Sequence, residues 1–338
     1  MPGDHDLLLQ VTTAGVCGTD LAEVTHGPSL TPVFDRHPLT GHVGPITLGH
    51  EFAGVVVATG SATTTPVGSH VASGSGVSCG ACPACRAGKT NLCSAYWTVG
   101  FHADGGLADY CVVPESVCVA FDETVLTDDA AALAQPMSIA VHAARAGNLA
   151  PAARVMVIGA GGIGAFLVAV VKHMQPDAQV VVMEPDPERR AVARQMGCDD
   201  ALAPGDMVEG TFNTIFEVSG TQSGLLAAAT AVVRGGTIVL VGIQHPGDLD
   251  RDLLRTATLD EISLVGASAH VLHSDFPTAL EILAARQDWS AVAPVVGSLE
   301  DCAEQLAQPG AGRPIKSLFS PQAASRREAN YSMIGEQR

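Results

Sequence analysis

Between residues 154 and 268 the chain alternates short β-branched runs with longer apolar segments of helical length. The stretch RVMVIGAGGIGAFLVAVV places such a run, a glycine turn and a helix-like segment in succession. Further β-branched runs follow in AQVVVME, NTIFEVSG, GGTIVLVG and EISLVGAS, and further helical patterns in DPERRAVARQMG and QSGLLAAATAVVR. This alternation predicts an α/β fold with a doubly wound parallel sheet and right-handed crossovers.

The region before residue 123 has a different pattern. It is rich in Gly, Pro, Thr and Val and has few periodic segments of helical length, as in PITLGHEFAGVVVATGSATTTPVGSHVAS. That pattern predicts an antiparallel, barrel-like β domain with long loops. After Ala269, the stretch SDFPTALEILAARQ predicts one more helix, and the polar ending predicts a loose tail.

Composition narrows the range of partners. The 338 residues carry a formal net charge of −17 with a pI near 4.9, so the average surface repels phosphate backbones and anionic membranes. The N-terminus lacks a basic region followed by an apolar one, and no uninterrupted apolar run reaches about 18 residues. We expect a soluble, cytoplasmic protein with two domains that binds a small molecule, and neither nucleic acid nor a membrane.

Gly159, Gly161 and Gly164 form the motif G-x-G-x-x-G, with Gly162 inside it. The motif follows a predicted strand and begins a predicted helix, so backbone N–H groups and the helix dipole can face a pyrophosphate. Glu184 ends the next predicted strand, where a carboxylate accepts the ribose hydroxyls of adenosine and repels a 2′-phosphate. The stretch predicts NAD(H) rather than NADP(H); a tight turn in a protein without a dinucleotide would use the same glycines.

Two basic residues follow Glu184 in the next predicted helix. Arg189 and Arg190 could hold a 2′-phosphate or simply face solvent. Because both lie beyond the carboxylate, we keep the preference for NAD(H), and we take Arg189 as a cofactor-binding candidate.

Four of the nine cysteines lie within the stretch SCGACPACRAGKTNLC. Cys79, Cys82, Cys85 and Cys93 have spacings that let four thiolates enclose one tetrahedral Zn²⁺, a closed site that orders a loop. An iron–sulfur cluster is an alternative, but no Cys-Pro follows the last cysteine. Four ordinary buried thiols are a further alternative.

A second set of metal-binding residue types is spread over the first half. Cys17 lies in GVCGTD, and His50 and Glu51 lie in LGHEFAG. Each alone could be an ordinary buried residue. Together, a thiolate, an imidazole and a carboxylate form a ligand set that leaves zinc one open position, in which a substrate oxygen can be stabilised.

With these motifs, the chain resembles the zinc-dependent medium-chain dehydrogenase/reductase family. The stretches HPLTGHVGPITLGHEFAGVV and SDFPTALEIL are most similar to the branch of the 2,3-butanediol, sorbitol and threonine dehydrogenases. The resemblance implies a GroES-like catalytic domain over residues 1–122, with a structural zinc lobe at 79–93. It also implies a Rossmann domain over 123–268 and a segment 269–338 that completes the catalytic domain.

The resemblance implies two zinc ions per chain: a catalytic one at Cys17 and His50, with Glu51 as ligand or close neighbour, and a structural one at the four clustered cysteines. Thr19 would accept the alcohol proton, and hydride would pass between the substrate and NAD(H). The expected substrate is a secondary alcohol, a vicinal diol or the matching ketone. Homodimers or homotetramers are expected by the same resemblance.

Two other functions stay open at this point. One is a tailoring dehydrogenase or reductase of the same family that acts on a larger natural-product or sugar-derived substrate. The other is a zinc-stabilised scaffold that has lost catalysis. A panel of polyols, diols and bulky ketones separates the first from the leading hypothesis, and the zinc content with nicotinamide binding tests the second.

Three features depart from the family pattern. Gln135 replaces an acidic residue near the catalytic zinc, which predicts a more Lewis-acidic and less tightly held metal. Ala22 replaces a histidine that often ends the proton relay, so the relay stops at Thr19, continues through ribose and water, or matters less. The N-terminus aligns some way into typical members, so the opening strands of the catalytic domain are expected to be missing.

Overall fold

The computed structural model describes residues 2–206, 210–243, 251–286, 288–308 and 314–323. The chain divides into two compact units: a β unit, Met1–Gln135 with Val271–Arg338, and an α/β unit, Pro136–His270. The sequence placed the divisions at 122/123 and 268/269. Residues 123–135 group with the β unit because α3 (Asp128–Ala131) packs against three strands of its sheet.

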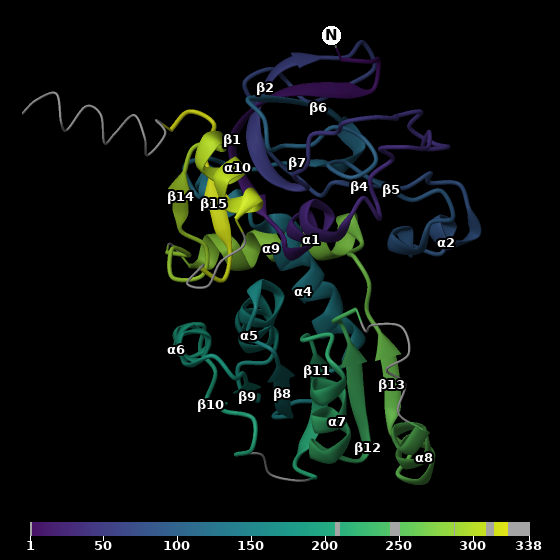
Figure 1. Ribbon diagram of the computed structural model, residues 1–338, viewed down its shortest axis with the longest axis vertical. Coiled ribbons are helices and arrows are strands. Elements are labelled where there is room, and N and C mark those ends of the chain that lie inside the picture. The colour runs from purple at the N-terminus through teal and green to yellow at the C-terminus, as the bar shows by residue number, and fades with distance from the viewer. Residues whose placement is uncertain (1, 207–209, 244–250, 287, 309–313, 324–338) are drawn as a thin grey trace, which may run out of the picture. The chain divides into compact units, whose positions relative to one another are not determined.

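A seven-stranded sheet forms the framework of the β unit. Its strands are β1 (Asp6–Val16), β2 (Glu51–Thr59), β3 (His70–Ser73), β6 (Tyr110–Pro114), β7 (Cys118–Ala120), β14 (Val295–Gly297) and β15 (Ser317–Phe319). The order is β14-β15-β1-β2-β3-β7, and β6 pairs with β1. All pairs are antiparallel except β14 with β15, so the predicted β-rich first domain is confirmed (Figure 1).

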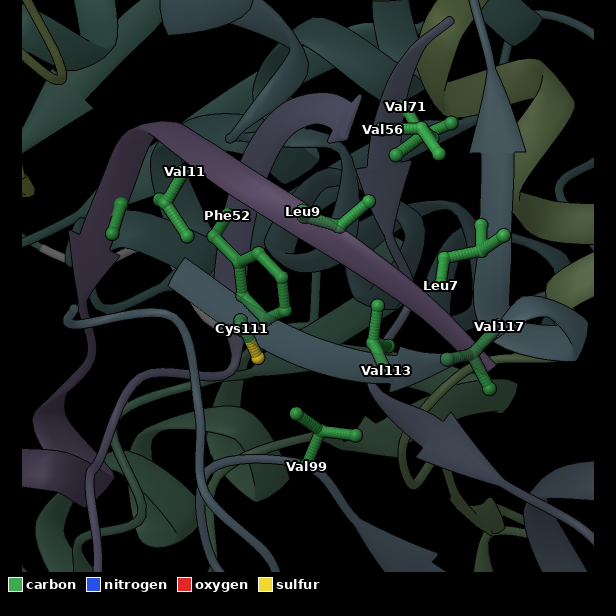
Figure 2. Close-up of a cluster of buried hydrophobic side chains, with 11 residues drawn as sticks. Leu7, Leu9, Val11, Phe52, Val56, Val71, Val99, Cys111, Val113 and Val117 are labelled. Carbon is green, nitrogen blue, oxygen red and sulfur yellow. The ribbon is translucent and has the colours of Figure 1, made fainter. Parts of the chain in front are cut away.

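Alternation along β1 builds the core of this unit. Leu7, Leu9 and Val11 are fully buried, whereas the residues between them are partly exposed, as expected for a strand with one face on the core. Phe52 from β2 and Val113 from β6 pack into the same cluster (Figure 2). Truncating a buried Phe of this kind typically costs about 3–5 kcal/mol.

Short elements complete the β unit. The pair β4 (Gly76–Val77) and β5 (Trp97–Thr98) forms a separate two-stranded sheet. Besides α3, its helices are α1 (Gly18–His26), α2 (Pro83–Arg86), α9 (Leu272–Ala285) and α10 (Leu299–Ala307), with 3₁₀ turns η1 (Thr90–Leu92) and η2 (Glu115–Val117). α10 contacts α1, so the C-terminal part of the chain packs beside the helix that follows β1.

A six-stranded, all-parallel sheet forms the α/β unit. Its strands are β8 (Arg154–Ile158), β9 (Gln179–Met183), β10 (Asp200–Leu202), β11 (Phe212–Glu217), β12 (Val232–Leu240) and β13 (Ser263–Gly266). They follow the order β10-β9-β8-β11-β12-β13. The helices are α4 (Ala134–Ala146, which begins in the β unit), α5 (Gly162–Met174), α6 (Pro187–Gln195), α7 (Gln222–Ala231) and α8 (Arg251–Leu259). The doubly wound pattern predicted from the sequence is confirmed (Figure 1).

One predicted boundary in this unit is wrong. The sequence extended the helix over QSGLLAAATAVVR, whereas α7 ends at Ala231 and β12 begins at Val232. Val232 pairs with Phe212 of β11, so β-branched residues that the helical periodicity had assigned to the helix belong to strand β12 instead. None of the helices in the described part of the chain is long and apolar enough to span a membrane.

Candidate active site

Two segments that are distant in sequence meet at the end of β1. Cys17 follows β1 as the N-cap residue of α1, and His50 directly precedes β2. Because β1 and β2 are antiparallel and Gly15 pairs with Glu51, the end of one strand lies beside the start of the other. The thiol of Cys17, the imidazole of His50 and the carboxylate of Glu51 offer ligand atoms that all lie within 4.8 Å of one another.

Asp20 was not among the residues predicted from the sequence, yet it contacts two of them. Its Oδ2 accepts the backbone N–H of Cys17 at 2.8 Å, and its Oδ1 lies 3.4 Å from Nδ1 of His50. Burial opposes protonation of His50, but Asp20 and Cys17 raise the pKa of the imidazole well above its ordinary value. Because Nδ1 faces this carboxylate, Nε2 is the nitrogen left for a metal. The capping-box spacing from Cys17 to Asp20 was the available signal.

Glu51 also has a partner that was missed. Nζ of Lys316 donates to Glu51 Oε1 at 2.6 Å and contacts Oε2 as well, and the two side chains are 5% and 1% exposed. Burial lowers the pKa of Lys316, but Glu51, Cys17 and Asp20 raise it above its ordinary value, so the side chain is an ammonium. A lysine directly before the short apolar strand β15 was the only sequence signal, because a buried lysine needs a carboxylate partner.

The remaining residues predicted for this site are placed as follows. Thr19 is the second residue of α1, and its Oγ1 lies 3.8 Å from Sγ of Cys17. Ala22 is exposed, one residue before the buried Glu23. Gln135 is the second residue of α4 and is buried. Its place beside the metal stays a prediction.

The donor set at Cys17, His50 and Glu51 fits zinc. One sulfur, one imidazole nitrogen and one carboxylate are zinc ligands that leave a tetrahedral position open. Lys316 donates to the same carboxylate. Glu51 can therefore be a metal ligand, or it can be a neighbour of the metal that pairs with the ammonium of Lys316. With Glu51 as the third ligand, the group would leave one tetrahedral position of a zinc ion open.

The four clustered cysteines form the second group of metal-binding side chains. The Sγ atoms of Cys79 and Cys93 are 3.4 Å apart. Backbone N–H groups point at the sulfurs: that of Cys79 donates to Cys93 and that of Cys82 to Cys79, both at 3.3 Å. Donation from the N–H of Cys85 and other groups lowers the pKa of Cys82 to about 5. N–H groups that stabilise thiolates fit a closed, structural zinc site with no open position.

The glycine motif forms the turn between β8 and α5. Gly159 has φ +95°, which favours glycine, and a Cβ on Gly164 would lie 1.9 Å from the carbonyl oxygen of Gly159. Gly161 is the N-cap residue and provides no side-chain cap for the first N–H groups of α5. These N–H groups are therefore available to an anion such as a pyrophosphate.

Glu184 follows β9 beside this turn and is 4% exposed. Its Oε2 accepts the N–H of Ala160 at 2.7 Å, and its Oε1 accepts the N–H of Asp186 at 3.0 Å. Glu184 and Arg189 both line a cavity of about 470 Å³ that also includes Gly159 and Gly161. Arg190 instead donates to the backbone carbonyls of Glu184 and Pro185, a structural role.

A separate cavity of about 680 Å³ lies on the β unit. Trp97, Asp104 and residues of β6 line it, and none of the predicted site residues does. It is therefore distinct from both the zinc-binding groups and the glycine turn.

Known proteins match the chain over most of its length. Residues 3–123 match the family model of the alcohol dehydrogenase GroES-like domain, and residues 162–285 match that of the zinc-binding dehydrogenase. The L-threonine 3-dehydrogenase of Saccharopolyspora erythraea is 35% identical over 254 residues, which are 72% of this chain and 71% of the relative. The sorbitol dehydrogenase of Bacillus subtilis is 29% identical over 294 residues, 83% of this chain and 80% of the relative.

Solved structures of dehydrogenases are also similar to the chain over most of its length. The 2R,3R-butanediol dehydrogenase of Bacillus subtilis has a TM-score of 0.84 and 25% identity, covering 95% of this chain and 94% of that one. A zinc-binding dehydrogenase of Sinorhizobium meliloti bound to NADP has a TM-score of 0.84 and 25% identity, covering 95% and 93%. An Escherichia coli alcohol dehydrogenase complexed with NADH has a TM-score of 0.82 and 26% identity, covering 95% and 93%. The chain belongs to the zinc-dependent medium-chain dehydrogenase/reductase family.

Proposed function

We propose that the protein transfers a hydride between NAD(H) and a secondary alcohol, a vicinal diol or the matching ketone. The observation that carries the proposal is the meeting of Cys17 and His50, whose ligand atoms, with those of Glu51, lie within 4.8 Å of one another. The open glycine turn of the α/β unit supplies a dinucleotide site in the same chain. The likeness to butanediol, sorbitol and threonine dehydrogenases supports the substrate class.

Each residue of the zinc-binding group has a defined part in this chemistry. When bound, the zinc supplies a Lewis acid for the substrate oxygen, and the nicotinamide supplies or accepts the hydride. Cys17 and His50 would hold the metal, and Asp20 would orient both through its contacts with the Cys17 N–H and His50 Nδ1. Thr19 takes the proton of the alcohol through its hydroxyl. Since Ala22 cannot carry that proton further, the next acceptor is water or the cofactor ribose.

The acidic end of β9 supports NAD(H) as the cofactor. The Glu184 carboxylate lines the cavity beside the glycine turn, where a 2′-phosphate would bring further negative charge against it. Arg189 lines the same cavity, but Asp186 lies 4.0 Å from its guanidinium and offsets part of its charge. We infer that NAD(H) binds more tightly than NADP(H).

Two zinc ions per chain complete the proposal. One would be held by Cys17 and His50, with Glu51 as ligand or neighbour, and the other by the four clustered cysteines. Only the first group can leave an open position for substrate, because four thiolates fill a tetrahedral site. The second therefore orders its loop.

The test is a metal measurement combined with a substrate panel on the purified full chain. We expect two zinc ions per chain and turnover of small secondary alcohols or diols with NAD in preference to NADP. Turnover of bulky ring ketones alone would replace the substrate class with the larger natural-product or sugar-derived one. One zinc per chain, with no nicotinamide binding by calorimetry, would overturn the enzymatic proposal.

A further inference from the structure

Two histidine rings stack in the β unit, one from each of two segments that are distant in the sequence. The rings of His37 and His102 have centroids 4.5 Å apart and planes inclined by 27°. His37 belongs to the connection between α1 and β2, and His102 follows β5. Both side chains are partly buried. Because the ordinary pKa of histidine is about 6.5, a pair of this kind can respond to pH near neutrality.

The ring of His102 closes the turn that carries it. Its Nδ1 accepts the backbone N–H of Thr98 at 2.9 Å, and the backbone N–H of His102 donates to the Thr98 carbonyl at 2.8 Å. Since Nδ1 is an acceptor here, the proton of the neutral ring lies on Nε2. A second proton would go to Nδ1 and would point at the Thr98 N–H. This hydrogen bond therefore exists only while the ring is neutral.

Thr40 ties the two histidines together. Its backbone N–H donates to His37 Nδ1 at 3.2 Å, and its Oγ1 donates to the backbone carbonyl of His102 at 2.5 Å. The segment is also closed on itself, because the N–H of Gly41 donates to the carbonyl of His37 and the N–H of His37 donates to that of His42, both at 2.9 Å. Residues 37–42 are thus attached to the turn 98–102 by the stacked rings and by Thr40.

The surroundings of the pair favour a neutral His102. Burial lowers the pKa of His102 below its ordinary value, and the neighbouring His37 lowers it further, because two stacked imidazolium rings repel each other. Glu23 of α1 opposes this and raises the pKa in part. Burial raises the pKa of Glu23 itself, but hydrogen bonds from Ser29 and Thr31 lower it to about 2. The charge of Glu23 is therefore constant over the range in which His102 titrates.

The other charged and titratable side chains of the two segments have partners of their own. Arg36 donates to a backbone carbonyl of its segment, and Nε2 of His42 lies 3.1 Å from another. Asp104 accepts the backbone N–H of Thr47 at 2.8 Å, and Asp35 is exposed. The protonation of His102 is therefore set by burial, by His37 and by Glu23.

The turn that His102 closes also carries a side chain that contacts the zinc-binding group. Phe101 is buried, and its ring centroid lies 4.7 Å from that of His50. The backbone N–H of Phe101 donates to the Thr98 carbonyl, the same carbonyl that accepts the N–H of His102. A change in this turn therefore reaches the packing around the His50 imidazole.

We propose that His37 and His102 form a pH-sensitive latch that is closed at neutral pH and opens in mild acid. In the closed latch, the neutral rings hold residues 37–42 on the turn 98–102. Protonation of His102 breaks the bond from the Thr98 N–H and releases both segments, which loosens the packing of Phe101 on His50. The latch is independent of the proposed dehydrogenase function, since it uses neither the metal nor the cofactor.

The direction of the pH effect follows from the two states of His102. In the open latch the ring is in water and has the ordinary pKa of about 6.5, whereas the pKa of the closed ring is lower. Below about pH 6.5 the open latch therefore takes up a proton that the closed latch does not. Each further unit of pH favours opening by up to about tenfold, until the pKa of the closed ring is reached.

Hydrogen exchange of single amides in the zinc-loaded full chain measures the latch. The Thr98 N–H exchanges when the latch opens, whereas the Val56 N–H, which donates to the carbonyl of Ser69 at 3.0 Å, reports general loosening of the β unit. After correction for the intrinsic pH dependence of exchange, we expect the protection of Thr98 to fall about three- to tenfold from about pH 7.5 to about pH 5.5, with Val56 unchanged. Equal losses at both amides, or no loss at Thr98, would overturn the latch.

The variant His102→Asn separates the charge from the hydrogen bond. Asparagine offers an acceptor oxygen at the same number of bonds from the backbone as Nδ1, but it does not titrate. The protection of Thr98 should therefore be the same at both pH values. His173→Asn, on the exposed surface of α5, is the matched control and should respond to pH as the wild-type protein does. If His102→Asn still loses protection of Thr98 in acid, the latch is overturned.

Titration of the histidine rings by NMR tests the latch in the wild-type protein, without any substitution. The Cε1–H resonance of His102 should titrate at a lower pH than that of the exposed His173, because burial and His37 lower the pKa of His102. A His102 ring that titrates at the same pH as His173 or above it would overturn the latch. This result does not depend on whether the protein oxidises an alcohol, so the latch and the proposed function are tested separately.

Discussion

Lys316 contacts both carboxylate oxygens of Glu51, although 265 positions separate the two residues in the chain. The contact joins the residue before β15 to the first residue of β2, directly beside Cys17 and His50. A zinc ion held here by the Cys17 thiolate and the Glu51 carboxylate would have a net charge of zero by simple counting. The ammonium of Lys316 adds one positive charge next to these side chains. The negative charge of the buried Asp20, which lies beside His50 Nδ1, offsets it.

Replacing Lys316 by Met should destabilise the metal-free protein strongly. The substitution leaves the buried Glu51 without its cation, a loss of about 3–5 kcal/mol in the free energy of unfolding. Lys172→Met is the control, because the pair of Lys172 and Asp199 is partly exposed and is worth about 0–1 kcal/mol. Urea unfolding after chelation measures both. If both variants lose a similar free energy of unfolding, the buried pair of Lys316 and Glu51 contributes no more to stability than the exposed pair.

Asp20→Asn should weaken zinc binding at the catalytic group. Loss of the negative charge removes the partner of His50 Nδ1 and weakens the bond to the Cys17 N–H, so we expect a drop of about 10–100-fold in zinc affinity or turnover. Asp301→Asn is the control, since Asp301 completes the capping box of α10 in the same way, away from His50. If both variants lose zinc equally, the effect belongs to helix capping.

Gln135→Glu tests whether the departure from the family pattern tunes the metal. A carboxylate at this position should bind zinc more tightly and shift the pH–rate profile to higher pH, because added negative charge makes the metal a weaker Lewis acid. Gln195→Glu, on the exposed surface of α6, adds the same charge elsewhere. Zinc affinity and a pH–rate profile that both stay at wild-type values in Gln135→Glu would refute the role assigned to Gln135.

Cys82→Ser should damage folding before it affects chemistry. In the proposed structural site four thiolates would hold one zinc and order the loop, so the variant is expected to hold one zinc per chain in place of two and to unfold at a lower urea concentration. Cys198→Ser removes an isolated, partly buried thiol and serves as the control. A Cys82→Ser protein that stays fully folded and loses turnover alone would move the reaction to the cysteine cluster.

Glu184→Ala should reduce the preference for cofactors without a 2′-phosphate. Calorimetry with ADP and 2′,5′-ADP measures this without turnover, and we expect the affinity ratio to fall about 10–100-fold, equivalent to about 1.4–2.8 kcal/mol. Because Ala160 also loses the acceptor of its N–H, binding of both nucleotides should weaken. Glu188→Ala, exposed in the first turn of α6, is the control. An unchanged ratio in Glu184→Ala would remove Glu184 as the determinant.

Local patterns were sufficient for the fold and for most of the residues that the structure groups as candidate metal ligands. The alternation of β-branched runs and helical periodicity predicted the parallel sheet, because each strand and helix carries its own burial pattern in consecutive residues. The grouping of four cysteines was predicted for a similar reason. Residues that lie close together in one short loop can be brought together without any distant part of the chain, as for Cys79, Cys82, Cys85 and Cys93.

The missed residues have partners that local sequence patterns do not predict. Lys316 reaches Glu51 through the pairing of β15 with β1 and of β1 with β2, which no periodicity near residue 316 reveals. Glu23 looks like an ordinary helix residue in the sequence, but the backbone N–H groups of Ser29, Leu30 and Thr31 donate to its carboxylate. The predicted end of α7 was wrong for the same kind of reason, because the pairing of β12 with β11 sets where the helix ends.

The sequence by itself therefore determined most of the elements, the glycine turn and the cysteine cluster, all of which depend on residue type and short-range spacing, and it offered Cys17, His50 and Glu51 as candidate metal ligands. Only the tertiary structure decided which charges surround those ligands: Asp20 against His50, Lys316 against Glu51, and Glu23 against the segment leading to them. The physical reason is that a buried charge is stabilised by whatever the fold brings within about 3–4 Å of it, and strand register, not sequence distance, sets that neighbour.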